Sequence, residues 1–579
     1  MPKRWRIAAY DRQRVAELER AAGVPAVVAQ LLLARGIDDP DAARTFLDPK
    51  LNGLRDPDEL PGAAAAADLL HAAISAGRRI TVYGDYDADG MTATAILLRC
   101  LRLLRANVDS YIPHRIDEGY GLNDEALRRL SERGADVVVT VDCGIASVAE
   151  AALARELGLT LVVTDHHQMA ESLPDAVALV HPALPGADYP FTGLCGAAVA
   201  FKLAWALCQR AAGAKRVTEP MRRYLLQAVG LAAIGTVADV VPLVDENRIL
   251  VREGLKALLH SPTVGVAAML RQCKIDDKPM LEGEDLGFAI GPRLNAAGRL
   301  GQAEIGVELL TTEDEARADT LAKFVDELNA ERQSLERSIY RAADKQARER
   351  FDPARDAALV LADHQWHPGV IGIVAGRLCE KYHRPVILVA ADELGVKPGV
   401  GSARSVPGFN LHSALTECSE HLEGYGGHAA AAGLRVTEAN LPAFRRAFCA
   451  VAARELGDGA ALPDLRVDGE AALSMLTHQT VAQIESLAPF GHGNSRPVLC
   501  TSNVRLAEAP RRMGGSGRHL SMTVDQAGVR MRAVAFGGGD WEDELAAVEG
   551  ELSIAFRPVI NRFRGRVSVE IHIADWRVD

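Results

Sequence analysis

Three aspartates stand at alternate positions in the short stretch GDYDADG. Asp85, Asp87 and Asp89 have the spacing of the first ligands of an EF-hand calcium loop, which also needs a bidentate Glu at its twelfth position. Counted from Asp85, that position is Ile96, which cannot bind a cation. The preceding residues, RRITVY, are β-branched and apolar, so they predict a strand rather than the entering helix of a calcium loop. We infer that the aspartates follow the end of a strand.

Acidic and imidazole side chains also end other predicted segments of the same region. The strand pattern in VTVDCG ends at Asp142, and the one in VVTDHH ends at Asp165, His166 and His167. Asp239 follows the helical pattern LAAIGTVAD. Apolar strands alternate with helices here, which is typical of a parallel sheet covered on both faces. The carboxyl ends of such strands form a ligand crevice, so these side chains should converge.

The converging groups predict a metal site. Carboxylates that lie together repel one another unless a cation is present. Oxygen ligands with one or two imidazoles suit Mn²⁺ or Mg²⁺ better than structural zinc. There are more acids than one ion needs, so we expect two divalent metal ions, a pair that serves in-line displacement at phosphorus. A single aspartate at a strand end is more often a turn residue or a helix cap, so the joint pattern carries this prediction.

The whole chain, at 579 residues, predicts several domains. The expected fold class is α/β: a parallel-sheet catalytic domain joined by a long helix to a second α/β domain, followed by an antiparallel β-barrel of OB type. The long helix should begin with a capping box of Thr312 and Glu315. The expected boundaries are residues 1–75 for an N-terminal helical segment packed on the catalytic domain, 76–311 for the catalytic domain, 312–351 for the long helix, 352–457 for the second domain and 458–579 for the barrel.

Composition narrows the partners and the compartment. A net charge of −12 argues weakly against a sheath of basic charge, but a local basic groove is enough to bind phosphates. Nine cysteines without a C-x-x-C pair indicate reduced thiols and a cytoplasmic protein. Neither a secretory signal nor a membrane span is recognisable, so no membrane partner is expected. The chain should suffice as a monomer.

Several motifs carry a resemblance to a known family. DYDADG, VDCG, TDHH and VADVVPL, in this order, resemble the DHH phosphoesterases. Five further segments are similar to the single-strand-specific exonucleases of that family: IPHRIDEGYGLN, GPRLNAAGRLG, WHPGVIGIVAGRL, GSARSVPGFNLH and GYGGHAAAAG. The resemblance runs from about residue 75 to the end. It implies a metal-dependent 5′→3′ exonuclease that releases 5′-mononucleotides from single-stranded DNA in repair and recombination. It also implies a single-strand-binding protein and a RecQ-type helicase as partners.

The resemblance assigns roles in the acidic cluster. The implied metal ligands are Asp87, Asp89, Asp142, His166 and Asp239, with Asp142 as the bridging ligand. His167 resembles the residue that contacts the phosphate or assists the leaving group. Related pyrophosphatases have a metal-binding His where this chain has Tyr83. Asp85, or water, would have to compensate for that His, and we count Asp85 among the catalytic candidates.

Further residues resemble substrate contacts. The second domain is similar to the DHHA1 module, in which Ser402 and Arg404 would bind phosphate and the loop of Gly426, Gly427 and His428 would let the backbone approach one. Arginine binds phosphate oxygens bidentately, although each could instead form a surface or interdomain salt bridge. The remaining candidates are Arg115, Arg293 and Arg299 as phosphate clamps, and Arg562, Phe563 and Arg564 as single-strand contacts of the barrel.

Two rival functions remain open. One is a DHH phosphodiesterase or phosphatase that acts on short oligonucleotides or dinucleotides, whose members are typically shorter and lack the terminal barrel. The other is a scaffold without activity, which would have lost metal ligands that this chain retains.

Overall fold

The structure is a computed structural model that describes residues 3–115, 118–352, 356–392, 395–457, 464–515, 517–563 and 566–578. It divides into two compact units, one of residues 56–239 with 254–461 and one of residues 1–55, 240–253 and 462–579. Within the described residues, no helix is both long and apolar enough to cross a membrane.

The first sheet confirms the predicted parallel α/β domain. Its strands run in the order β3-β2-β4-β5-β6, and every neighbouring pair is parallel. The strands are β2 (Arg79–Tyr83), β3 (Asn107–Tyr111), β4 (Val137–Val141), β5 (Thr160–Thr164) and β6 (Ala178–Val180). β4 is buried along its whole length, as expected for a strand covered on both faces. The carboxyl ends of β2, β4 and β5 are the points where the acidic motifs begin.

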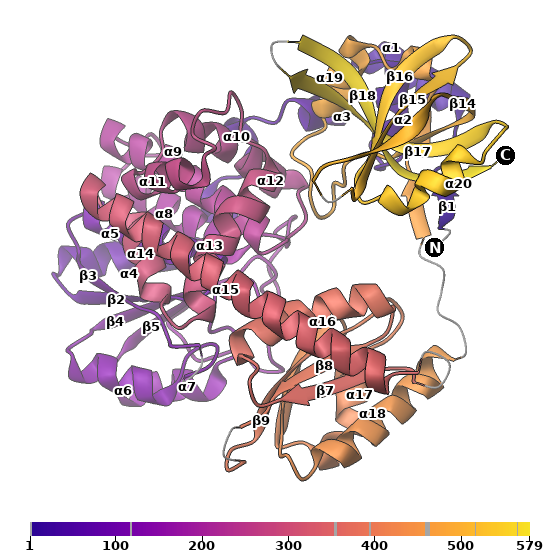
Figure 1. Cartoon of the computed structure of the whole chain (residues 1–579). Coiled ribbons are helices and arrows are strands. Elements are labelled where there is room, and N and C mark those ends of the chain that lie inside the picture. Colours follow the sequence, from indigo (N-terminus) through magenta and orange to yellow (C-terminus); the bar gives the residue numbers. More distant parts are fainter. Residues whose placement is uncertain are drawn as a thin grey trace. The chain divides into compact units, whose positions relative to one another are not determined.

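Helices cover both faces of this sheet (Figure 1). One layer contains α6 (Asp124–Glu132) and α7 (Val148–Glu156), whose leucines and alanines pack against β4 and β5. Asn123 caps α6, as predicted, by accepting a hydrogen bond from the backbone N–H of Ala126. The other helices of this domain are α4 (Ala63–Ser75), α5 (Ala88–Leu103), α8 (Gly196–Ala212), α9 (Glu219–Ala238), α11 (Val264–Cys273), α12 (Gly283–Asp285), α13 (Gly291–Arg299) and α14 (Ala303–Thr311).

The predicted long helix is α15 (Glu315–Arg350), with 36 residues (Figure 1). Its predicted start is wrong by two residues. Asp314, not Thr312, is the N-cap, and its carboxylate accepts a hydrogen bond from the N–H of Arg317. Thr312 instead accepts a bond from Asp314 at the end of α14, so a carboxylate closer to the free N–H groups has taken the capping role.

The second sheet lies at the far end of α15 in the same unit. Its order is β10-β11-β9-β8-β7, with only β7 and β8 parallel. The strands are β7 (Leu359–Asp363), β8 (Val386–Ala390), β9 (Gly399–Arg404), β10 (Gly424–Gly427) and β11 (Ala431–Val436). The helices are α16 (Pro368–Tyr382), α17 (Leu411–Glu417) and α18 (Leu441–Leu456). This is the α/β architecture expected for the second domain.

The other unit contains the predicted barrel. Strands β14, β15, β16, β18 and β17 form a ring that closes where β14 pairs with β17. One correction applies, because β16 and β18 are parallel. A closed ring with an odd number of strands cannot make every neighbouring pair antiparallel. The bounds are β13 (Gly469–Glu470), β14 (Leu499–Met513), β15 (His519–Gln526), β16 (Val529–Ala535), β17 (Leu552–Phe563), β18 (Arg566–Val578), α19 (His478–Glu485) and α20 (Glu542–Ala546).

The predicted N-terminal segment, residues 1–75, is divided between the two units: residues 56–75, with α4, belong to the unit of the catalytic domain, and residues 1–55 belong to the unit of the barrel. The helices of residues 1–55 share a hydrophobic core with the barrel, in which Val28 and Leu31 lie with Leu499 and Phe556. Strand β1 pairs in parallel with β12 directly before the barrel. Packing of these helices on the barrel removes apolar side chains of both from water. The N-terminal elements are β1 (Arg4–Ile7), α1 (Arg12–Ala22), α2 (Ala26–Leu33) and α3 (Pro40–Leu47). The same unit contains β12 (Asp464–Val467) and the part of α10 (Asp245–His260) up to residue 253.

Candidate active site

The structure brings the acidic and imidazole groups together. Ligand atoms within 4.8 Å of one another form three groups, which are Asp89, His166 and Asp239; Asp85, Asp87 and Asp142; and Asp142, Asp165, His166 and His167. The first two groups share no residue and supply three donors each. They meet where Nε2 of His166 lies 3.0 Å from Oδ1 of Asp142. Two adjacent three-donor groups are what a pair of divalent cations requires.

Helix N-termini hold two of these carboxylates in place. Asp87 caps α5, accepting hydrogen bonds from the N–H groups of Asp89 and Gly90. Asp89 accepts bonds of 2.7 and 2.9 Å from Gly196 and Ala197 at the start of α8. Free N–H groups and the positive end of a helix dipole favour anionic side chains at these points. Sequence reasoning did not find the role of α8, because Gly196 lies more than a hundred residues from Asp89.

A glycine makes room for one of the ligands. A Cβ at Gly235 of α9 would lie 2.3 Å from Oδ1 of Asp89 and 2.5 Å from the Cβ of Ala197. Only glycine therefore lets α9 approach α8 and α5 closely enough to bring Asp239, at the C-terminal end of α9, to the cluster.

Unsatisfied polar atoms show that the cluster fits a metal. Oδ1 of Asp85, Oδ1 of Asp142 and Nε2 of His166 are buried and form no hydrogen bond with any residue that the structure describes. Buried polar atoms without partners are costly, and they need an explanation such as an ion. The donors are carboxylate oxygens and one imidazole nitrogen, which suit Mn²⁺ or Mg²⁺.

Electrostatics lead to the same conclusion. Burial and the neighbouring Asp87 raise the pKa of Asp89 to about 6. Burial and the neighbouring Asp89 raise the pKa of Asp239 to about 8 and that of Asp142 well above its usual range. Burial lowers the pKa of His166 to about 3, so its imidazole is neutral and able to bind a metal at physiological pH. The carboxylates become fully ionised together only when cations compensate their charge.

His167 is held differently from His166. Its Nδ1 lies 2.8 Å from Oδ1 of Asp165 and 2.9 Å from the hydroxyl oxygen of Tyr120, whose proton is donated to the backbone carbonyl of Asp142. Burial lowers the pKa of His167, but the bond to Asp165 and the surrounding carboxylates outweigh it and raise the pKa to about 9. In the metal-free chain His167 is therefore a cation, and the contacts of its Nδ1 orient the ring. Sequence reasoning missed Tyr120, although it lies in the motif IPHRIDEGYGLN.

Tyr83 does not replace the histidine of the related pyrophosphatases. Its side chain is buried, with its hydroxyl donating to the carbonyl of Gly121 and accepting from the amide of Asn123. The hydroxyl is thus occupied on the side of α6. Asp85 lies instead in one ligand group with Asp87 and Asp142, and a Cβ at Gly90 would clash with it.

Two of the predicted arginines, Arg115 and Arg299, lie near the acidic cluster, and Arg404 lies near these two arginines. The guanidinium of Arg115 stacks over the ring of Tyr86 at 4.6 Å, next to Asp85. Nη1 of Arg299 donates to the carbonyl of Gly369 and so links α13 to the start of α16. Burial and the charges of Arg115, Arg332 and Arg404 lower the pKa of Arg299 to about 10. Cations that repel one another in a half-buried place form a site for an anion such as phosphate.

Arg293 has a different set of contacts from these arginines. Its guanidinium forms an ion pair of 2.8 Å with Asp326 on α15 and a hydrogen bond to the carbonyl of Ala289. These contacts correspond to the salt-bridge alternative, in which Arg293 ties α13 to α15.

The predicted phosphate residues of the second sheet lie in register. Gly426 of β10 pairs with Gly433 of β11, which in turn pairs with Ser402 of β9. Oγ of Ser402 accepts a hydrogen bond from Nη1 of Arg404. Gly426, Gly427 and His428 are exposed, and His428 donates its backbone N–H to Ala431. The sheet therefore presents a row of small residues and one arginine along adjacent strands.

Among the predicted barrel residues, Arg562 is exposed near the end of β17. Arg564 lies outside the described residues, and only the backbone of Phe563 is described, opposite Arg566.

Comparisons with known proteins agree with this architecture. Residues 79–236 match the DHH family, N-terminal domain, residues 356–454 the DHHA1 domain, and residues 467–575 the RecJ OB domain. The Single-stranded-DNA-specific exonuclease RecJ of Bacillus subtilis is 38% identical over 99% of this chain and 70% of that protein. The one from Dickeya dadantii is 36% identical over 97% of this chain and 98% of that protein.

Solved structures are similar as well. The crystal structure of RecJ in complex with Mn²⁺ from Thermus thermophilus matches with a TM-score of 0.83 at 35% identity, covering 100% of this chain and 80% of that one. The corresponding complex with Mg²⁺ matches with a TM-score of 0.78 at 33% identity, covering 100% of this chain and 78% of that one.

Proposed function

Because the chain belongs to the RecJ family of single-stranded-DNA-specific exonucleases, we propose that its acidic cluster hydrolyses the phosphodiester bonds of single-stranded DNA. Attack begins at the 5′ end and releases 5′-mononucleotides. The observation that carries the proposal is the convergence of the unsatisfied ligand atoms of Asp85, Asp142 and His166 on one buried place.

Asp89, His166 and Asp239 would hold one divalent ion, and Asp85, Asp87 and Asp142 the other. Mn²⁺ or Mg²⁺ bound there would supply Lewis-acid activation of water and of the scissile phosphate. The helix N-termini that hold Asp87 and Asp89 keep these ligands in position before substrate arrives.

His167 acts on the substrate side of the cluster. Because Asp165 and Tyr120 both contact Nδ1, Nε2 is the ring atom left to face the phosphate. As a cation, His167 stabilises charge on the phosphoryl oxygens, and it can give its Nε2 proton to the leaving 3′-oxygen.

The arginine cluster binds the terminal phosphate. Arg115, Arg299 and Arg404 are near enough to influence one another electrostatically, and Arg299 is also near Asp87. Ser402, Gly426, Gly427 and His428 extend this contact along β9 and β10. All these residues address the backbone rather than base edges, so cleavage should not depend on sequence.

Selectivity for single strands would come from a channel between the two α/β domains that admits one strand and excludes a duplex. Arg562, together with Phe563 and Arg564, would bind a more distant part of the strand by backbone contact and stacking. From the family resemblance we also infer a cytoplasmic monomer that acts with a single-strand-binding protein and a RecQ-type helicase. The physiological context would be DNA repair and recombination.

One experiment separates the proposal from its main alternative, a phosphodiesterase for short oligonucleotides or dinucleotides. A long 5′-phosphorylated strand, labelled at either end, and a dinucleotide are each incubated with the protein and Mn²⁺. The proposal expects early release of mononucleotide from the 5′ label, late release from the 3′ label, and slow cleavage of the dinucleotide. Faster cleavage of the dinucleotide than of the long strand would favour the alternative, and early release from the 3′ label would contradict the polarity.

A further inference from the structure

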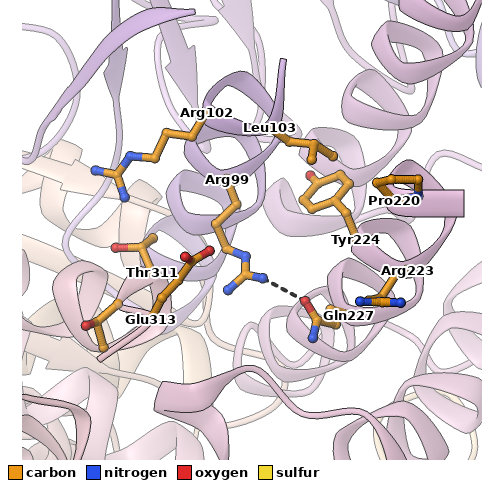
Figure 2. Close-up of a pocket in the computed structure, with 10 residues that line it drawn as sticks. Arg99, Arg102, Leu103, Pro220, Arg223, Tyr224, Gln227, Thr311 and Glu313 are labelled. Carbon is orange, nitrogen blue, oxygen red and sulfur yellow. Dashed lines mark hydrogen bonds between the residues drawn. The ribbon is translucent and has the colours of Figure 1, made fainter. Parts of the chain in front are cut away.

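A cavity lined by arginines is drawn in Figure 2. It lies at the C-terminal part of α5 and the N-terminal part of α9, and Asp89 and Asp239 lie at the other ends of these helices. Its volume is about 690 Å³, and it is lined by residues of α5, by the first part of α9 and by the segment that follows α14. Along α5, Arg99 lies ten residues after Asp89, which corresponds to about 15 Å of helix. Along α9, Asp239 at the C-cap lies sixteen residues after Arg223, which corresponds to about 24 Å of helix. The cavity is therefore separate from the acidic cluster.

Positive charge predominates in this cavity. Arg99, Arg102 and Arg223 line it, and Glu313 is its one acidic lining residue. Within the described residues, none of the three arginines forms an ion pair closer than 4 Å, whereas many exposed arginines of this chain do, such as Arg317 with Glu308. Three cations against one carboxylate leave an excess that an anion would balance.

Arg99 is held in place for binding. Its side chain is half-buried, and Nη2 donates a 2.7 Å hydrogen bond to Oε1 of Gln227. The amide nitrogen of Gln227 donates in turn to the carbonyl of Pro262, which fixes which end of the amide faces Arg99. Burial is the main reason that the pKa of Arg99 is lowered. A desolvated guanidinium held by a neutral amide binds an anion more strongly than one exposed to water.

Apolar groups form one part of the wall, and Gln227, Thr311 and Thr312 add neutral polar groups to the rest. Leu103 and Pro220 line the cavity, and the buried ring of Tyr224 is fixed by a hydrogen bond from its hydroxyl to the carbonyl of Ile96. Figure 2 shows these groups beside Arg99 and Arg223. A volume of this size accommodates a small organic ligand rather than a bare ion. An apolar wall next to guanidinium groups suits a ligand with one flat apolar part and one phosphate.

We propose that this cavity, which we name the distal pocket, binds a phosphorylated small molecule of nucleotide size. Arg99 and Arg223 contact the phosphate, with Arg102 adding positive charge. Leu103, Pro220 and Tyr224 pack against the base. The pocket is concave and has Glu313 in its wall, which favours a compact phosphorylated ligand over an extended polyanionic strand. The proposal does not depend on the activity assigned to the acidic cluster.

The test measures binding of thymidine 5′-monophosphate to the full-length chain by titration calorimetry. EDTA removes cations, and an Arg404→Gln background weakens phosphate binding near the acidic cluster. Arg223→Gln in this background should weaken binding by about tenfold, the usual loss for one charge-assisted contact. Arg222→Gln is the matched control, because Arg222 is the exposed neighbour on the same helix and does not line the cavity.

Orthophosphate and a 5′-hydroxyl oligothymidylate serve as comparison ligands. Orthophosphate should bind more weakly than the nucleotide, because it lacks the base that the apolar wall would contact. Equal binding by the Arg223→Gln and Arg222→Gln variants would overturn the proposal, as would an oligothymidylate that binds where the mononucleotide does not. Arg223 is exposed, so its substitution should leave the fold intact, and this is checked by the melting temperature.

Nuclease assays on the same variants without the Arg404 substitution keep the two proposals distinct. Arg223→Gln should cleave single-stranded DNA in the absence of added nucleotide as the unsubstituted chain does. The proposed nuclease would be refuted if the unsubstituted chain degraded no DNA. The proposal for the distal pocket would still hold in that case, provided that Arg223→Gln weakened binding of the mononucleotide.

Discussion

Nε2 of His166 lies 3.0 Å from Oδ1 of Asp142, yet no hydrogen bond joins the two atoms. Asp142 follows β4 and His166 follows β5, which are neighbouring parallel strands. Both atoms are buried and point into the same small space. Two acceptor atoms at this distance repel each other unless nearby cations, each held by the other ligands of its group, attract both. The contact therefore marks the place where the two ligand groups adjoin.

Replacing Asp142 should separate stability from activity. Asp142→Asn replaces a carboxyl group whose ionisation burial and the neighbouring carboxylates oppose, and Asn tolerates the positive φ of 63° at this position. The metal-free variant should therefore melt at a higher temperature than the metal-free parent. Nuclease activity should fall by at least about 100-fold, since loss even of a supporting partner of a ligand can cost 10–100-fold.

Melting curves in EDTA and in Mn²⁺, together with nuclease rates, test this prediction. An Asp142→Asn protein that keeps the activity and the Mn²⁺-induced rise in melting temperature of the parent would contradict the assignment of Asp142 as a ligand.

Stabilisation by metal should increase with pH. The pKa of Asp239 is raised to about 8 and that of Asp89 to about 6, both above the usual value of 3.8. Between about pH 4 and about pH 8 the folded, metal-free chain thus binds protons that the unfolded chain has released, and its free energy of unfolding falls as the pH rises. Bound cations remove this penalty. The rise in melting temperature on adding Mn²⁺ should be larger at about pH 8 than at about pH 6, and an equal rise at both would speak against the raised pKa values.

Loss of the charge on Asp165 should move the alkaline limit of activity. Asp165 accepts the hydrogen bond that raises the pKa of His167 to about 9. If protonated His167 assists the leaving group, activity is lost as the pH rises through that pKa. In Asp165→Asn the pKa falls, so the loss should begin at a lower pH.

Tyr120→Phe is the matched control for this experiment. It removes the other contact to Nδ1 of His167 but no charge. We expect a lower kcat, because the ring is less well oriented, with the alkaline limit little changed. The comparison fails to support the assigned role of His167 if both variants have the pH profile of the parent.

Arg404 and Arg293 should differ in their effect on substrate binding. Arg404 is half-buried and bonds only to Ser402 and a backbone carbonyl among the described residues, whereas Arg293 is neutralised by Asp326. Arg404→Gln should raise KM for a 5′-phosphorylated strand by about tenfold, the loss of one charge-assisted contact, and by less for a 5′-hydroxyl strand. Arg293→Gln should leave KM unchanged and lower the melting temperature. The reverse pattern would place the phosphate near Arg293.

Local sequence patterns were sufficient to predict which site residues lie at the ends of strands. Asp87, Asp142 and His166 could be located because apolar strands alternate with helices, and parallel strands in one sheet must end on a common edge. The same periodicity predicted the parallel sheet, α15 and the barrel. These features depend on residues that lie within a few positions of one another, so a single sequence contains them.

Tertiary structure decided the contacts between residues that are distant in sequence. The tether from Tyr120 to His167, the bond from Gly196 to Asp89 and the ion pair of Arg293 with Asp326 each join different elements. The pairing of β1 with β12 crosses most of the chain and places the N-terminal helices on the barrel. No local pattern selects such partners, because packing energy over the whole chain chooses them, and many alternatives have the same residue types.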